Sequence, residues 1–217
     1  MGVSYFDEVY SSSKQYYGDH PENMLRDYFS MCDKKGRVLD IGIGQGRNAR
    51  FLLQQGYGVD GIDQSGIAVE GLDKMIKDEN LDLKLFHLDF NLFNCAPRTY
   101  SAILLIGLFP VLSEAQIIDL AQKSRKWLRK KGLIFVTGYT TSEANLRPAT
   151  QDWHKTSEYS YADDKGNFRT FLDVDDAISK FRRFKPIYQW EGFGERHSHG
   201  EDQIEQHHIF EIILQKI

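Results

Sequence analysis

The chain has 217 residues, of which 41% are hydrophobic, and it carries a formal net charge of -4 at pH 7. A chain of this length and composition can bury the core of one globular domain, and its small negative charge gives no general attraction to nucleic acids or anionic membranes. Two cysteines, no secretory leader and no long apolar run indicate a reducing, cytoplasmic setting. Neither nucleic acid nor membrane is therefore expected as a partner.

Strands and helices alternate through most of the chain. After a tyrosine-rich leader, a helix is predicted over residues 21–31, with Pro21 in its first turn. The strands that follow are predicted at 37–41, 57–62, 83–88, 101–106 and 133–137. The helices between them are predicted at 47–55, 67–77 and 113–129. Repeated strand–helix units of this kind predict a largely parallel sheet with helices on both faces.

The pattern changes after residue 137. The polar, aromatic-containing stretch 138–167 is too long for an ordinary connection, so we expect residues 138–172 to form a functional lid over a substrate site. A helix is predicted next at 174–184. Two extended segments, 186–195 and 207–216, then predict an antiparallel hairpin at the end of the chain.

These elements predict an α/β fold with a Rossmann-like, seven-stranded, mostly parallel sheet, helices on both faces and a C-terminal antiparallel hairpin. We expect residues 1–217 to form a single domain, with residues 1–31 as an N-terminal cap. Ligands of such sheets bind beyond the carboxyl ends of the strands. The polar residues at those ends are therefore the first candidates for a site.

A glycine-rich turn follows the first predicted strand, with Gly42, Gly44 and Gly46 at alternate positions. A dinucleotide-binding turn would place its third glycine at position 47, which is Arg47. Asp40, just before the turn, would repel a pyrophosphate but suits a ligand that carries an ammonium and a sulfonium. S-adenosylmethionine is such a ligand. The alternative is a glycine-rich turn that binds nothing.

Acidic residues also end the next two predicted strands. Asp63 lies about twenty residues after the glycine turn, where a carboxylate can accept hydrogen bonds from both ribose hydroxyls. The alternative role for Asp63 is a helix N-cap, for which Ser65 competes. Asp89 can accept from an adenine amino group. Apolar surface for the base would come from Phe90, Ile106 and Leu108.

The order of these motifs and the C-terminal hairpin resemble the class I S-adenosylmethionine-dependent methyltransferases, over the whole chain. The segments 39–48, 55–57 and 60–63 resemble more narrowly the branch that contains tellurite-resistance and thiopurine-type methyltransferases. The leader resembles the segment that folds over the cofactor in that branch. The resemblance implies S-adenosyl-L-methionine as cofactor, held by Tyr17, Asp40, Gly42, Gly44, Gly46, Arg47, Asp63, Gln64, Asp89, Phe90 and Ile106.

The chain departs from the family pattern in two places. Ile43 stands where the family often has cysteine, and the stretch 138–167 is an insertion over the acceptor pocket. The loop 106–110 has no amide or carboxylate, which argues against methylation of amino groups of bases or glutamine, and against metal-assisted catechol chemistry. No resident metal is therefore expected.

Four histidines surround the turn of the predicted hairpin: His197, His199, His207 and His208. His197 or His199 is a candidate general base for an acceptor, with Arg196 helping to orient an anionic one. Metal binding and a solvated polar turn are the alternatives. Tyr139 is a further candidate for the acceptor pocket, and Trp153 in the lid would seal it from water.

The predicted reaction is an in-line displacement that transfers a methyl group to a small-molecule acceptor, such as a thiol or a chalcogen oxyanion. The protein would supply alignment and a dry pocket, so no covalent nucleophile is needed. A non-catalytic protein that binds S-adenosylmethionine or S-adenosylhomocysteine is the main alternative. An NAD-dependent oxidoreductase is a second one, which Asp40 and Arg47 disfavour.

Overall fold

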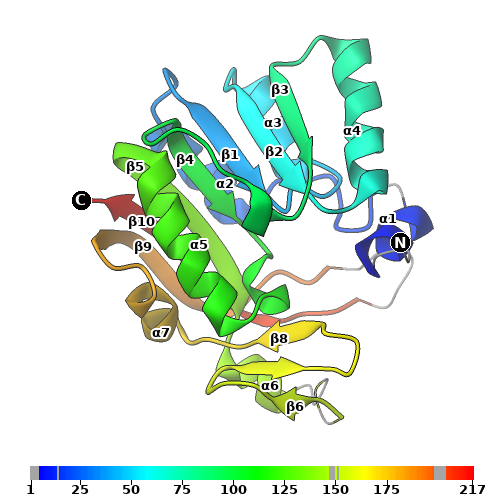
Figure 1. Ribbon diagram of the computed structural model, residues 1–217, viewed down its shortest axis with the longest axis vertical. Helices are drawn as coiled ribbons and strands as arrows, with labels where there is room; N and C mark the ends of the chain where they lie inside the picture. The colour runs from blue at the N-terminus through cyan, green and yellow to red at the C-terminus, as the bar shows by residue number, and fades with distance from the viewer. Residues whose placement is uncertain (1–4, 14, 147–149, 151, 198–203) are drawn as a thin grey trace.

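The computed structural model describes residues 5–13, 15–146, 150, 152–197 and 204–217, and its main sheet has seven strands in the order β3-β2-β1-β4-β5-β10-β9 (Figure 1). The parallel strands are β1 (Arg37–Ile41), β2 (Val59–Asp63), β3 (Leu83–His87), β4 (Tyr100–Leu105) and β5 (Leu128–Tyr139). The antiparallel hairpin β9 (Phe184–Phe193) and β10 (His208–Lys216) completes the sheet through β5. The predicted Rossmann-like fold with a terminal hairpin is confirmed.

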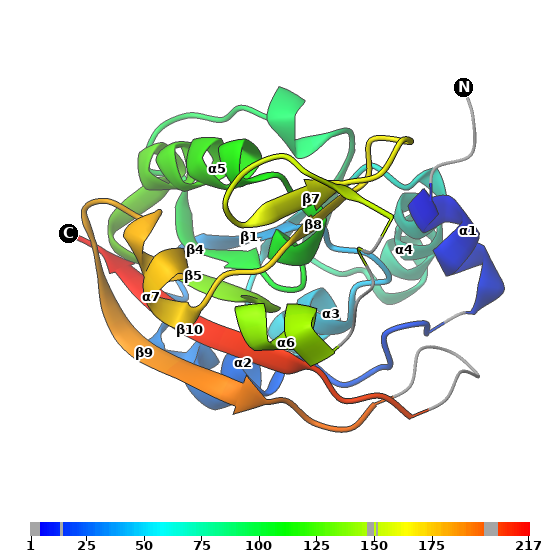
Figure 2. The same cartoon turned by 90° about the horizontal axis from the view of Figure 1, so that it is seen from below.

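Helices cover both faces of this sheet (Figures 1 and 2). One face carries α2 (Asn23–Tyr28), α3 (Arg47–Gln54) and α4 (Gly66–Glu79). The other carries α5 (Glu114–Trp127) and α7 (Val174–Ser179). Each face has its own cluster of buried apolar side chains, because parallel strands that are buried on both faces consist of nearly continuous apolar residues.

A charge network, with Asp60 buried and Asp82 exposed, holds the amino ends of the central strands together. Arg37 on β1 donates from Nε to Asp60 Oδ1 on β2 at 2.6 Å, and from Nη1 to Asp82 Oδ1 at 2.6 Å. Tyr100 on β4 donates its hydroxyl to Asp60 Oδ2 at 2.9 Å. Both carboxylate oxygens of Asp60 therefore have a partner, and the network joins three neighbouring strands at the edge of the sheet opposite the glycine turn.

The lid contains regular structure that the sequence analysis did not predict. It begins with α6 (Thr141–Leu146) and continues into a separate antiparallel sheet of β6 (His154–Lys155), β7 (Ser160–Ala162) and β8 (Phe168–Thr170). Strands of two or three residues leave too short a pattern to recognise in the sequence. A buried hydrogen bond of 2.6 Å between Ser160 Oγ and Thr170 Oγ1 joins β7 to β8, and Thr170 Oγ1 also donates to the carbonyl of Leu112, which ties the small sheet to the main body.

Several predicted boundaries were also wrong. The helix predicted at 21–31 is α-helical only in α2, and the 3-10 helix η1 (Phe29–Met31) follows it. The helix predicted at 174–184 ends at Ser179, and β9 then begins at Phe184. Two further 3-10 helices, η2 (Phe90–Leu92) and η3 (Phe109–Val111), follow β3 and β4. In the part of the chain that the structure describes, no helix combines the length and the apolar character needed to cross a membrane.

Candidate functional site

A cleft of about 1590 Å³ lies at the carboxyl ends of the parallel strands. Five parts of the chain contribute to its lining: the leader, the glycine turn, the loops after β2 to β5, the lid, and the hairpin β9–β10. Figure 2 shows how the leader helix α1 (Tyr5–Ser12) and the lid strands approach this edge of the sheet from different sides. The cleft therefore occupies the position at which open α/β sheets bind their ligands.

The glycine turn adopts a backbone conformation that side chains disfavour. Gly42, Gly44 and Gly46 have φ angles of 75°, 53° and 80°. A Cβ atom at Gly44 would lie 2.8 Å from the hydroxyl oxygen of Tyr10, and one at Gly46 would lie 2.5 Å from Cδ2 of Leu72. The left-handed conformation favours glycine at all three positions, and a Cβ at Gly44 or Gly46 would also displace a neighbouring side chain. The turn leads directly into the amino end of α3.

Asp40 lies beneath this turn, at the end of β1, and is not among the described residues that line the cleft. Only 3% of the residue is exposed, and its Oδ2 atom is buried and accepts no hydrogen bond from any described residue. Burial, and then the negative charge of Asp63, raise the pKa of Asp40 to about 7, although Arg47 lowers it. A cationic group bound in the turn, directly or through an ordered water, would compensate this carboxylate. The turn therefore suits the ammonium group of S-adenosylmethionine.

Asp63 lines the cleft next to the glycine turn. Its Oδ2 accepts a hydrogen bond of 2.8 Å from the N–H of Gly44, and its Oδ1 accepts one of 2.8 Å from the N–H of Ser65. Burial raises the pKa of Asp63, and these N–H donors oppose that rise. Ser65 itself is the N-cap of α4, since its Oγ accepts from the N–H of Ala68 at 3.2 Å. Because Ser65 caps α4, Asp63 is left facing the turn.

The other residues predicted for the cofactor end also line the cleft: Tyr17, Gln64, Asp89, Phe90 and Ile106. Asp89 is the N-cap of η2, and its Oδ1 accepts from the N–H of Asn91 at 2.8 Å. This bond orients the carboxylate at the end of β3. Phe90 and Ile106 are half-buried, and each packs against the core cluster of one face of the sheet, which fixes its position.

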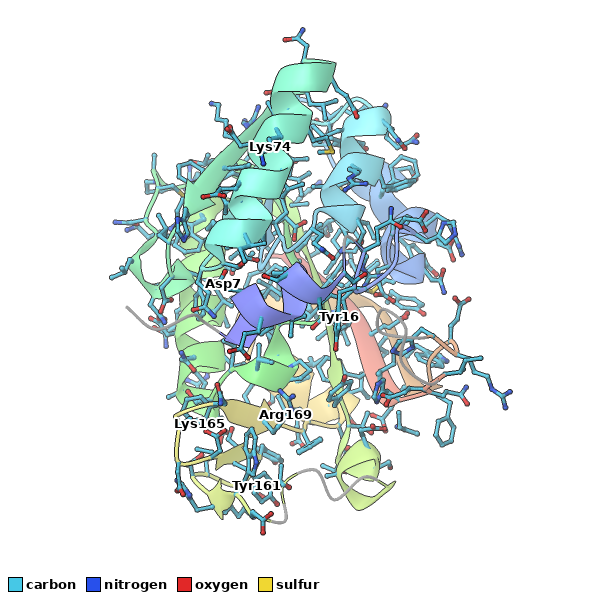
Figure 3. All side chains as sticks on the ribbon, turned by 90° about the vertical axis from the view of Figure 1, so that its right-hand side faces the viewer. Asp7, Tyr16, Lys74, Tyr161, Lys165 and Arg169 are labelled. Atoms are coloured by element: carbon cyan, nitrogen blue, oxygen red, sulfur yellow. The ribbon has the colours of Figure 1, made fainter. Side chains whose placement is uncertain are left out.

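The leader lies over the glycine turn and is attached to it by side chains. Gln45 accepts from the N–H of Tyr16 at 2.8 Å and donates from Nε2 to the carbonyl of Ser13 at 2.6 Å. Asp7 accepts from the hydroxyl of Ser65 at 2.5 Å. Figure 3 shows Asp7 and Tyr16 at the two sides of this cover, above the lid residues. The leader therefore forms a wall of the cleft.

Arg47 also lines the cleft, but its guanidinium contacts the leader. Its Nη2 lies 2.9 Å from Glu22 Oε2, and its Nη1 donates to the carbonyl of His20 at 3.2 Å. Sequence reasoning assigned Arg47 to the cofactor alone. In the structure Arg47 also holds the end of the leader against the first turn of α3.

Tyr139 and His197 meet around His207, where the lid and the hairpin line the cleft. The ring of His207 lies 4.9 Å from that of Tyr139 and 5.1 Å from that of His197, measured between centroids. The end of β9 lies at the same edge of the sheet as the carboxyl ends of the parallel strands, which brings His197 there. His199 lies outside the described residues. Among those that are described, no three His, Cys, Asp or Glu side chains are grouped to hold a metal ion.

Sequence reasoning missed the carboxylate that orients His207. Glu143 on α6 is 3% exposed, and its Oε1 lies 2.7 Å from His207 Nδ1. Its Oε2 accepts from the N–H of His208 at 2.8 Å, and Glu205 Oε2 lies 3.2 Å from His207 Nε2. His207 is therefore held between two carboxylates. Nothing in the sequence around Glu143 indicates this contact, because Glu143 and His207 are 64 positions apart and Glu143 belongs to the lid.

The lid adds basic and aromatic side chains to the same end of the cleft. The Cζ atom of Arg169 lies 5.8 Å from the ring centroid of Trp153, within the range of a cation–π contact. Lys165, in the turn between β7 and β8, also lines the cleft. In Figure 3 both basic residues lie below α1, on the side of the lid that faces the leader.

A second carboxylate that the sequence analysis missed lies on the hairpin. Glu211 on β10 is 8% exposed and lines the cleft. The signal was present in the sequence, since Glu211 interrupts the otherwise apolar run 209–214 of a central strand. A carboxylate in such a run is uncommon unless it has a partner or a function.

Comparison with known proteins gives a consistent result. Residues 38–132 match the model of a family described as a methyltransferase domain. Two curated relatives, both named probable S-adenosyl-L-methionine-dependent methyltransferase TehB and taken from two strains of Haemophilus influenzae, are 23% identical over 151 residues. The aligned segment is 60% of this chain and 52% of each relative, so the chain spans about half the length of the curated relatives it matches.

Two solved structures share the fold over nearly the whole chain. TehB from Haemophilus influenzae has a TM-score of 0.71 at 19% identity, and the match covers 98% of this chain and 67% of that one. A structure from work on the conversion of a disulfide bond into a thioacetal group during echinomycin biosynthesis has a TM-score of 0.71 at 17% identity, covering 97% and 90%. At such identities the likeness establishes the fold, and the site must be argued from its own residues.

Proposed function

We propose that this chain, which carries a class I S-adenosylmethionine-dependent methyltransferase domain similar to that of TehB, transfers a methyl group from S-adenosylmethionine to a small-molecule acceptor. The observation that carries the proposal is the glycine turn above Asp40. Three left-handed glycines allow close approach of a ligand, and the uncompensated carboxylate beneath them requires a cation. The proposal takes residues 1–217 as one domain with the leader as cap and residues 138–172 as lid.

The cofactor would lie along the carboxyl ends of β1, β2 and β3. Asp40 would face its ammonium group, Asp63 its ribose hydroxyls and Asp89 the amino group of its adenine. Phe90 and Ile106 would pack on the faces of the base. The glycine turn, Gln64, Tyr17 and Arg47 would enclose the rest of the molecule.

When bound, the cofactor supplies a methyl group on a positively charged sulfur, which an acceptor lone pair displaces in line. The acceptor would enter between the lid and the hairpin. His197 would remove a proton from it or orient it, and Tyr139 would line its path. His207 would position both rings, because Glu143 and Glu205 engage both of its nitrogens. Trp153 would exclude water from the closed cleft.

The chemistry of the lid suggests the acceptor classes to test first. A soft, nucleophilic acceptor needs little acid–base help, which suits a pocket whose loop after β4 is apolar. Thiols meet this condition, as do chalcogen oxyanions, and Lys165 and Arg169 would attract the anionic forms of either.

Calorimetric titration with S-adenosylhomocysteine, and with NAD as the control, tests the cofactor. We expect the first to bind and the second to give no heat of binding. Incubation with methyl-labelled S-adenosylmethionine and a panel of thiols and chalcogen oxyanions then tests transfer. Binding of S-adenosylhomocysteine without transfer to any small molecule would support the non-catalytic alternative, and tight binding of NAD alone would overturn the proposal.

A further inference from the structure

The cleft extends past the glycine turn to the face of the sheet that α2 and the hairpin β9–β10 enclose. We call this part the acidic lobe and define it by residues that all line the cleft: Glu22, Tyr28, Tyr188, Trp190 and Glu211. The rings of Tyr28 and Tyr188 lie 4.8 Å apart, and Glu211 is paired with Trp190 across β9 and β10. The lobe thus combines aromatic surface with carboxylates, on elements that are far apart in the sequence.

Glu211 differs from the other acids nearby in lacking a cation. Glu22 pairs with Arg47 at 2.9 Å, and Asp27 pairs with Arg26 at 3.1 Å. Among the described residues, no Lys, Arg or His lies within ion-pair distance of Glu211. Its described hydrogen-bond partner is the hydroxyl of Tyr188, which donates to Oε2 at 3.1 Å.

This arrangement costs folding free energy while the lobe is empty. Glu211 is buried in a strand between Phe210 and Ile212, and a buried carboxylate without a cation is unfavourable. Burial, and then the charge of Glu22, raise the pKa of Glu211 to about 7, while the hydrogen bond from Tyr188 opposes that rise. A hydrogen bond between β9 and β10 alone would not need a carboxylate, because a neutral glutamine accepts from a tyrosine equally well.

A ligand cation would remove this cost. A buried carboxylate attracts an ammonium group, and the faces of tyrosine and tryptophan rings attract it as well. The same negative charge would repel an oxyanion. The lobe therefore selects ligands by charge, at the end of the cleft that lies beyond the proposed methionine site.

We propose that the acidic lobe binds an amine group of the methyl acceptor in its ammonium form, with Glu211 as the residue that determines this specificity. The inference rests on the proposed methyltransferase function. It concerns recognition, and the methylated atom can be a different one, for instance the sulfur of an acceptor that also carries an amine. A chalcogen oxyanion would be excluded from this lobe and confined to the lid end.

The test compares phenethylamine with 2-phenylethanol, which has the same ring and chain without the charge. Both are titrated into protein saturated with S-adenosylhomocysteine, and the fluorescence of the tryptophans, including Trp190 in the lobe, reports binding. We expect the amine to bind at least about tenfold more tightly than the alcohol, since a charged hydrogen bond contributes that much or more. This comparison needs no variant and therefore does not depend on whether a variant folds.

Variants then assign the preference to Glu211. Glu211→Gln should lower the affinity for phenethylamine about tenfold or more and leave that for 2-phenylethanol unchanged. Tyr188→Phe removes the hydrogen bond but keeps ring and carboxylate, so amine binding should persist. Glu70→Gln, at an exposed site on α4, is the matched control and should change neither affinity.

The pH dependence adds an independent readout. Affinity for the amine should rise from pH 6 to pH 8 in the wild type, as Glu211 ionises, and the rise should be absent in Glu211→Gln. The other titratable groups around Glu211 are Glu22 and Asp27 from the segment of α2, Tyr188 from β9, Tyr28, and Glu195 beyond β9. Glu22 and Asp27 each lie within ion-pair distance of an arginine, and the comparison with Glu211→Gln, which keeps both, separates their contribution to the pH dependence from that of Glu211.

Three results would overturn the inference. They are equal binding of amine and alcohol to the wild type, an unchanged amine affinity in Glu211→Gln, and a loss of S-adenosylhomocysteine binding in Glu211→Gln as large as the loss of amine binding. The last result would assign the lobe to the cofactor. Failure of the wild type to bind S-adenosylhomocysteine would instead contradict the proposed function, so the two failures are distinguishable.

Discussion

Replacing Asp40 by asparagine should stabilise the ligand-free protein and weaken cofactor binding. Asparagine has nearly the same shape as aspartate but no charge, so it removes the cost of ionising a buried group whose Oδ2 has no described partner. The folded pKa of Asp40 is about 7, against 3.8 for the unfolded chain. The difference of about three pKa units corresponds to roughly 4 kcal/mol.

The sign of the pH dependence follows from the raised pKa. Below about pH 4 both the folded and the unfolded forms hold the proton, and Asp40 leaves the free energy of unfolding unchanged. As the pH rises, the unfolded chain ionises first, so the wild type loses stability progressively up to about pH 7. Asp40→Asn should lack this loss. At pH 8 it should therefore be more stable than the wild type by up to about 4 kcal/mol, or roughly 10 °C in melting temperature.

The assay is thermal or urea unfolding of both proteins at pH 5 and pH 8, with and without S-adenosylhomocysteine. The ligand should stabilise the wild type at pH 8 because its ammonium compensates Asp40, and it should stabilise Asp40→Asn much less. Parallel stability curves for the two proteins, or equal stabilisation by the ligand, would refute the placement of an ammonium group above Asp40.

Other parts of the fold and site give further predictions. Arg37→Leu removes the cation that pairs with buried Asp60 and should lower the free energy of unfolding by about 3 kcal/mol, measured by urea denaturation. A loss below about 1 kcal/mol would show that the pair contributes little. Gln45→Ala releases the leader and should speed dissociation of S-adenosylhomocysteine in stopped-flow experiments, without lowering the melting temperature of the ligand-free protein by more than a few degrees. Gly46→Ala should abolish cofactor binding. Gly56 has a similar φ of 81° but open space around it, so Gly56→Ala should lower the free energy of unfolding by about 1 kcal/mol and leave cofactor binding normal. Equal cofactor affinities of the two alanine variants would contradict the need for glycine in the turn.

The sheet and the cofactor end could be predicted because both depend on local sequence. Buried parallel strands need continuous apolar runs, and the turn after β1 needs glycines at fixed positions because its φ angles are positive. The sequence also offered two candidates for the N-cap of α4. Ser65 competed with Asp63 for the N-cap of α4 in the sequence, and the structure gives the cap to Ser65.

The contacts between the lid and the hairpin could not be predicted, because they join segments that are distant in sequence. The strands of the lid sheet are too short to show the alternation of apolar and polar residues that identifies a strand. The sheet depends instead on the hydrogen bond between Ser160 and Thr170 and on contact with the main body. Glu143 reaches His207 only because α6 packs beside β10. Such pairings follow from tertiary packing, and no pattern within either segment reveals them.

The distribution of charge in the cleft leads to an order of binding. The charge of Asp63 raises the cost of ionising Asp40, and Glu211 is a further carboxylate of the cleft that has no cation among the described residues. An ammonium group above Asp40 would compensate that carboxylate, and a second cation in the acidic lobe would compensate Glu211. Tyr10 lies over the glycine turn, so the leader must move before the cofactor can leave, whereas Tyr10 is not one of the residues that define the acidic lobe. The geometry therefore favours a cofactor that binds first and leaves last, with acceptors exchanging while it is held.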